Sequence, residues 1–172
     1  GFEANIICNA NCASPTIYVD TSTYTHEQLV TDVLITGCLQ ANNVTFTGDP
    51  QGIGYFMNAY GIGIQEGVIM SSGSVLDAPG NGNSTFASTS LTYSSGDPLL
   101  DAIVSPDITT DVTILEFDFI PSSDTMQFDF IFGSEEYPEF VPSFNDVFAF
   151  FLTGPNPGGG NYTNYNVALI PG

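Results

Sequence analysis

Two stretches of the sequence carry phenylalanine at every second position, mostly with acidic residues between. Residues 114–120 read I-L-E-F-D-F-I, and residues 126–132 read M-Q-F-D-F-I-F. Successive side chains of a β-strand point to opposite faces, so each stretch predicts a strand with one aromatic and one polar face. The turn-forming sequence P-S-S-D, residues 121–124, lies between them. The pattern therefore predicts a β-hairpin whose phenylalanines face the core.

Other short strands are expected along most of the chain, whereas helices are expected only twice. The further expected strands are Ile6–Ile7, Thr16–Val19, Asn43–Thr47, Gly67–Ser71, Val147–Leu152 and Asn166–Ile170. Apolar residues at helical spacing predict a helix over residues 25–34, with Thr25 as N-cap and Gln28 as its capping-box partner. A shorter helix is expected from Pro98 to Ile103. Many short strands with so little helix favour an all-β fold, a β-sandwich or jelly roll.

Three segments rich in Gly, Asn, Ser, Pro or Tyr are expected to be loops. They are residues 77–96, residues 155–160 and the stretch from Gly158 to Tyr165. The last is either an ordinary flexible loop or a hydrogen-bonding contact surface.

The charge of the chain excludes several classes of partner. The 172 residues include 19 Asp and Glu but no Lys or Arg. Nucleic acid is excluded because phosphate binding needs basic side chains, and anionic membrane surfaces are excluded for the same reason. No apolar run of about 18 residues is present, so no membrane insertion is expected. Solubility alone is the other explanation of the charge.

An acidic cluster late in the chain is a candidate metal site. Glu135, Glu136 and Glu139 lie within five residues, and Asn145 and Asp146 follow at the expected start of the next strand. Carboxylate and amide oxygens are the ligands that Ca²⁺ prefers, and no basic side chain is available to pair with them. The alternative is that some carboxylates cap backbone amides and the others are solvated.

Catalytic signals are weak. His26 is the only histidine and is expected at the surface near a helix start, and no G-x-S-x-G motif is present. Glu135 and Glu136 are adjacent, so in a strand they would point to opposite faces, which disfavours a glycosidase pair. We therefore expect a protein without enzymatic activity.

Cysteines and glycosylation motifs fit an exported protein. One disulfide among Cys8, Cys12 and Cys38 would leave a third thiol, either buried or linking subunits. The sequence N-x-S/T occurs three times, at Asn43, Asn83 and Asn161, which supports secretion weakly.

Several motifs together resemble a known family. They are T-H-E-Q-L-V at 25–30, V-T-F-T-G at 44–48, G-V-I-M-S-S-G at 67–73, L-E-F-D-F at 115–119, G-S-E-E-Y-P-E-F-V at 133–141, F-N-D-V-F-A-F-F-L at 144–152 and N-V-A-L-I-P-G at 166–172. The chain thereby resembles the choice-of-anchor L domain family of bacterial surface and secreted proteins, common in Bacteroidetes. The resemblance covers roughly residues 24–172 and divides the chain into an N-terminal strand segment, residues 1–23, and this domain. It implies export to the outside of a cell and no defined chemistry.

Two departures from the family pattern matter. Relatives often carry a cysteine just before the N-D-V-F motif, where this chain has Pro142 and Ser143. The usual partner of Cys38 is therefore absent, and the resemblance leaves Cys12 or Cys8 as its partner. Relatives also continue beyond the I-P-G motif, so we expect an unfilled sheet edge.

These observations favour a noncatalytic extracellular structural or adhesive module. The expected partners are further copies, as a homo-oligomer or a filament built by donating strands from residues 2–19, or else a complete monomeric sandwich whose N-terminus pairs within its own sheet. The alternative function is a calcium-dependent carbohydrate-binding module that uses Tyr and Asn side chains on the loops, and a secreted hydrolase ranks third.

Overall fold

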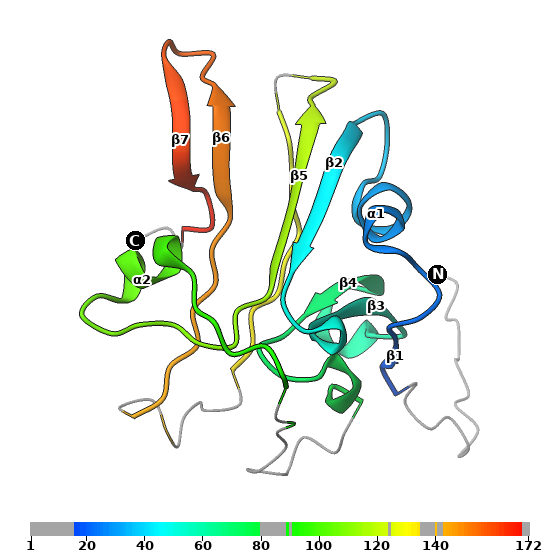
Figure 1. The fold of residues 1–172 in the computed structure, drawn as a ribbon. Coiled ribbons are helices and arrows are strands. Elements are labelled where there is room, and N and C mark those ends of the chain that lie inside the picture. Colours follow the sequence, from blue (N-terminus) through cyan, green and yellow to red (C-terminus); the bar gives the residue numbers. More distant parts are fainter. Residues whose placement is uncertain are drawn as a thin grey trace, which may run out of the picture.

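Antiparallel strands dominate the computed structural model, which describes residues 16–79, 89, 91–123, 125–134, 140 and 143–169. This part of the chain contains two α-helices, and both are short. The strands form three separate antiparallel sheets (Figure 1). The all-β class is thereby confirmed, whereas the predicted packing of two sheets as a sandwich is not.

The first sheet has the strand order β1-β3-β4, formed by Tyr18–Asp20, Ile53–Met57 and Glu66–Met70. Two of these strands overlap predicted ones, but β3 was missed. Its side chains are buried on both faces, so its sequence, I-G-Y-F-M, lacks the alternation that marks a half-buried strand. Gly54 allows β1 to approach closely, because a Cβ there would lie 2.7 Å from the carbonyl oxygen of Asp20.

The hydrophobic core of the described residues lies against this first sheet. Val19, Phe56, Ala59 and Val75 form one buried cluster. Ile17, Ile64 and Ile69 pack around it and are partly buried. Val75 begins a 3₁₀ helix, Val75–Asp77, so a loop element as well as the strands supplies the core.

The predicted helix over residues 25–34 is confirmed in position. It begins as α1, His26–Gln28, and continues as a π-helical turn, Leu29–Leu34. The predicted capping box is present, because the Thr25 hydroxyl accepts a hydrogen bond from the Gln28 N–H and the Gln28 side chain accepts one from the Thr25 N–H. Leu29 and Val30 are its buried residues.

The second sheet contains two strands, β2, Gln40–Thr47, and β5, Ile114–Ile120. The register between them shifts between Asn42 and Thr45, and Asn43 lies at this bulge with a φ of 52°. Strand β5 was predicted with its correct bounds. The predicted hairpin with residues 126–132 is wrong, because these residues form no strand and the sheet contains β2 and β5 alone among the described residues.

The third sheet is a hairpin that extends away from the rest of the chain in Figure 1. It consists of β6, Phe151–Pro155, and β7, Asn161–Asn166, joined by a glycine-rich turn. The turn confirms the predicted loop over residues 156–160, but Pro155 belongs to β6 and residues 161–165 are strand and not loop. The strand predicted at Asn166–Ile170 is also misplaced, because β7 ends at Asn166 and Ile170 lies outside the described residues. Strand β7 was missed because its sequence, N-Y-T-N-Y-N, is polar, and the strand has little burial on either face.

The second predicted helix is confirmed as α2, Pro98–Val104. Its N-cap is Asp97, whose carboxylate accepts hydrogen bonds from the N–H groups of Leu99 and Leu100. Two further 3₁₀ helices are formed by Pro50–Gly52 and Tyr60–Ile62.

The second phenylalanine stretch differs from the prediction. Residues 126–132 belong to no strand, and of the predicted strand at 147–152 only Phe151 and Leu152 lie in β6. The alternation correctly placed the rings on one face, but periodicity alone does not determine whether a backbone ladder forms.

Candidate functional site

Five phenylalanine rings from two separate segments pack against one another. They are Phe128, Phe130, Phe132, Phe148 and Phe150, which we call the aromatic surface. Ring centroids lie 5.3 Å apart in the pairs 128–150 and 130–148, and 5.8 Å apart in the pair 132–148. This pattern aligns the two segments antiparallel, because the residue number rises along one as it falls along the other.

The aromatic surface is open to solvent. Phe130 and Phe132 are 49% and 50% exposed, and Phe128 and Phe148 are also exposed, whereas Phe150 is half-buried. The prediction that the phenylalanines of residues 126–132 form core is therefore wrong. On β5 the outcome is closer to the prediction, because Phe117 and Phe119 are both half-buried. The described rings of the aromatic surface cover one another and are not covered by another sheet.

The backbone that carries Phe128, Phe130 and Phe132 makes no hydrogen bond within the described part of the chain, whereas the N–H and C=O of Phe150 are both bonded. Figure 1 draws the segment as an extended yellow trace. Among the described residues, no backbone N–H or C=O of residues 126–133 takes part in a hydrogen bond. Extended backbone with free donors and acceptors is the arrangement found at an open sheet edge.

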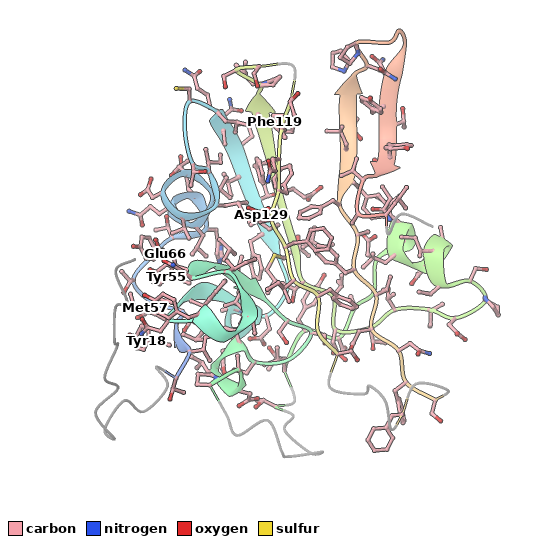
Figure 2. The ribbon with its side chains drawn as sticks, turned by 180° about the vertical axis from the view of Figure 1, so that it is seen from behind. Tyr18, Tyr55, Met57, Glu66, Phe119 and Asp129 are labelled. Atoms are coloured by element: carbon pink, nitrogen blue, oxygen red, sulfur yellow. The ribbon has the colours of Figure 1, made fainter. Side chains whose placement is uncertain are left out.

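Negative charge accompanies the aromatic surface. Asp129, labelled in Figure 2, lies between two of its phenylalanines and accepts a hydrogen bond from the Gln127 amide. The exposed carboxylates of Glu116 and Asp118 alternate with the rings of Phe117 and Phe119 on β5. With no Lys or Arg in the chain, these charges have no basic side chain to pair with.

A second feature is a hollow of about 190 Å³ beside the first sheet. Tyrosine rings and acidic side chains dominate its wall, which consists of Tyr24, Asp32, Val33, Thr36, Tyr55 and Glu66. The two tyrosine ring centroids are 5.2 Å apart. The Tyr55 hydroxyl donates a hydrogen bond to the Glu66 carboxylate at 2.5 Å, which raises the pKa of Tyr55 to about 12. Figure 2 shows Tyr55 and Glu66 side by side.

Sequence reasoning missed this hollow. Tyr55 lies on β3, the strand without alternation, and the antiparallel register of β3 with β4 brings it near Glu66. No local motif joins the two residues, because eleven positions separate them in the sequence. Only a correct assignment of both strands and their register would have identified the pair.

Three aspartates hold local structure through hydrogen bonds. The Thr23 hydroxyl and the Ser22 N–H bind the Asp20 carboxylate and lower its pKa. The Gln51 N–H and both polar groups of Thr92 lower the pKa of Asp49.

The third aspartate is Asp101 of α2. The N–H and then the hydroxyl of Thr109 donate to its carboxylate and lower its pKa. All three hydrogen-bond sets favour the ionised carboxylate, so none of these groups is held protonated as a general acid would be.

Comparison with known proteins gives the family. A family model described as the choice-of-anchor L domain matches residues 18–172, nearly the whole chain. The chain belongs to the choice-of-anchor L family. No match was found among curated proteins or among solved structures. Membership indicates a secreted or cell-surface module, and the family is not known for catalysis. No helix in the described ranges is long and apolar enough to cross a membrane.

In this choice-of-anchor L domain, most of the predicted calcium ligands lie outside the described residues. These are Glu135, Glu136 and Glu139. Asn145 and Asp146 are described and exposed, three and two positions before Phe148. The described residues contain no group of three or more His, Cys, Asp or Glu side chains able to hold a metal. The calcium site stays a prediction.

The predicted disulfide likewise stays a prediction. Cys38 is exposed and unbridged within the described residues, while Cys8 and Cys12 lie outside them. His26 is exposed, as predicted, and its ring packs 4.4 Å from that of Phe46, centroid to centroid.

The glycosylation candidates differ in their surroundings. Asn161 is exposed at the start of β7, whereas the Asn43 side-chain nitrogen donates a hydrogen bond to the Asp118 carboxylate at 2.7 Å. The nitrogen that would carry a glycan is thus already used at Asn43 in this conformation. Asn83 lies outside the described residues.

Proposed function

We propose that this choice-of-anchor L domain is a noncatalytic structural or adhesive module that associates with further copies of itself, as an oligomer or surface filament. The observation that carries the proposal is the aromatic surface, whose rings pack together yet remain open to solvent. Contiguous exposed apolar patches of this kind mark protein–protein interaction sites. Aromatic side chains are also enriched in the buried centres of interfaces.

Charge sets a condition on this association. The net charge of −19 disfavours contact between copies at low ionic strength. Salt at physiological concentration reduces repulsion between exposed charges beyond about 8 Å, and divalent cations bound by carboxylates reduce it further. Association is therefore expected to strengthen with salt and with Ca²⁺.

Three of the carboxylates are poorly suited to acid catalysis. A hydrolase of the glycosidase type needs one carboxyl group whose pKa is raised so that it can donate a proton. Asp20, Asp49 and Asp101 each have a lowered pKa because Ser, Thr or backbone groups donate hydrogen bonds to them. These aspartates stabilise turns and helix ends and are poorly suited to acid catalysis.

Light scattering of the purified domain at physiological salt, with and without millimolar Ca²⁺, tests the proposal. We expect species larger than the 18.3 kDa monomer. Phe148→Ser should reduce them, because it removes a ring from the aromatic surface. Tyr60→Ser is the matched control, since Tyr60 is an exposed aromatic residue outside this surface. A monomer under every condition would contradict self-association.

A second candidate function, calcium-dependent carbohydrate binding, is favoured by the tyrosine-lined hollow. Sugars bind proteins by stacking on aromatic rings and hydrogen bonding to carboxylates, and Tyr24, Tyr55 and Glu66 provide both groups. Glycan-array binding that is lost in Tyr24→Ala but kept in Tyr18→Ala would support this function. Tyr18 is exposed and does not line the hollow. Absence of glycan binding by the unmodified domain in the presence of Ca²⁺ would exclude it.

A further inference from the structure

We propose that residues 2–12 of one copy add as a β-strand along residues 126–133 of a neighbouring copy and cover its aromatic surface. This inference rests on the proposed self-association and names both the segment that is donated and the edge that receives it.

The receiving edge has free backbone groups over eight consecutive residues. No backbone hydrogen bond is made by residues 126–133 within the described part of the chain. Strand β3 of the first sheet differs, because it pairs on one side with β1 and on the other with β4. Strand addition satisfies free N–H and C=O groups of this kind directly.

The side chains of the receiving edge specify what the added strand must carry. Phe128, Phe130 and Phe132 project to the side on which they meet Phe148 and Phe150. A strand placed beside them therefore needs small or apolar side chains at alternate positions, with polar ones between. Its charge must also be low, because Asp129 lies on this edge and no basic residue is present in the chain.

Residues 2–12 have this pattern. They read F-E-A-N-I-I-C-N-A-N-C, so every even-numbered position is apolar: Phe2, Ala4, Ile6, Cys8, Ala10 and Cys12. The odd-numbered positions are polar except for Ile7, and Glu3 is the only acidic residue before Asp20. An eleven-residue alternation with one charge thus occurs in a chain that carries 19 acidic residues.

The short connection to β1 restricts where the donated segment can lie on its own copy. Five residues, 13–17, join the donated segment to β1, and β1 is fixed in the first sheet by its ladder with β3. Such a linker spans at most roughly 20 Å. Figure 2 shows Tyr18, the first residue of β1, and Asp129 on different parts of the molecule. A donor from a second copy is free of this restriction.

Strand donation of this kind would extend from one copy to the next. In this proposal each copy supplies residues 2–12 as donor and residues 126–133 as receiving edge, and the two are different surfaces. Head-to-tail contacts between different surfaces form open chains unless the rotation closes a ring. Strand donation of this type therefore accounts for a filament more readily than for a symmetric dimer.

Two matched pairs of substitutions in the full chain test the inference by light scattering and electron microscopy. Ile6→Asp and Phe130→Asp place a charge on the two faces that should meet, and both should reduce the assembled fraction at least tenfold. Ile7→Asp and Ile131→Asp add the same charge one position along, on the opposite faces. These two controls should assemble to within twofold of the unmodified chain.

The outcomes separate this inference from the proposed function. If all four variants assemble like the unmodified chain, another surface mediates assembly, so the strand inference is overturned and self-association stands. If Ile6→Asp and Ile7→Asp lose assembly equally, face-specific strand pairing is contradicted. If the unmodified chain is monomeric and Ile6→Asp accelerates amide exchange at 126–133, the segment binds its own copy, which overturns the neighbouring-copy assignment.

Discussion

The β1-β3-β4 sheet and the aromatic surface both use phenylalanine on extended backbone, yet they differ in what covers the rings. Phe56 on β3 is 8% exposed and packs in a cluster with Val19, Ala59 and Val75. Phe130 is 49% exposed, although it contacts two other rings. The first region is a hydrophobic core. The second has the apolar composition of a core, but no other part of the described structure buries its rings. The comparison shows that an apolar strand face in the sequence does not reveal which other surface buries that face.

The largest expected effect comes from making the same substitution in both regions. Phe56→Ala should lower the free energy of unfolding by about 3–5 kcal/mol, because it removes a buried ring and leaves a cavity. Phe130→Ala should lower that of the monomer by less than about 1 kcal/mol, since its ring is half in water already. Urea unfolding at low protein concentration measures both values. Equal losses would show that the aromatic surface is buried in the monomer.

The second largest expected effect on the free energy of unfolding comes from a disulfide between Cys38 and Cys12 or Cys8. Closing a loop of about 25 residues stabilises a fold by roughly 3 kcal/mol, so Cys38→Ser should cost a similar amount. Intact-mass analysis with thiol labelling identifies the bridge and its partner. A bridge at Cys12 leaves residues 2–11 available for donation, whereas one at Cys8 anchors the middle of the segment. Three labelled thiols would rule out the disulfide.

Calcium should act mainly on the side of the aromatic surface, because Asn145 and Asp146 lie three and two positions before Phe148. At a concentration one hundred times its dissociation constant, a bound ion stabilises the folded state by about 2.7 kcal/mol. EDTA should therefore lower the melting temperature by several degrees, and added Ca²⁺ should restore it. Asp146→Asn should weaken this response. Melting curves that are unchanged by both treatments would leave the carboxylates without a metal role.

The smallest expected effect is the pH dependence of the stability that Asp49 contributes. The lowered pKa of Asp49 means that its hydrogen bonds to Gln51 and Thr92 contribute stability fully above the unfolded pKa of about 3.9. This contribution is lost as pH falls through the still lower pKa of the folded state.

The measurement is the difference in free energy of unfolding between the unmodified chain and Asp49→Asn from pH 7 to pH 2.5. The difference should be constant above about pH 4.5 and should shrink below it. Asp107→Asn is the control, since Asp107 is exposed and its side chain makes no hydrogen bond in the structure. A difference that grows on acidification would contradict this account.

Local signals in the sequence predicted elements whose stability is local. The capping residues Thr25 and Gln28 predicted the first helix, and the alternation of Glu and Asp with Phe inside residues 114–120 predicted β5. Strand β3 was not predicted, because burial on both faces removes the alternation of apolar and polar residues. Strand β7 was not predicted either, because exposure of both faces also removes that alternation.

The candidate site was predicted in part. The phenylalanines of the aromatic surface were recognised and their face was correct, but they were assigned to the core because alternation does not report what lies opposite. The hollow at Tyr55 and Glu66 depends on strand register, which no local pattern contained. The acidic cluster was found by composition alone, and its metal role is still a prediction.

Hydrogen–deuterium exchange tests most directly whether the aromatic surface is an edge that a partner covers. At low protein concentration the amides of residues 126–133 should exchange rapidly, whereas those of β3, which pair on both sides, should exchange slowly. On assembly at physiological salt with Ca²⁺, exchange at 126–133 should slow at least tenfold while β3 changes little. Strong protection of 126–133 that does not depend on protein concentration would contradict the account, because the edge would then be filled within the monomer.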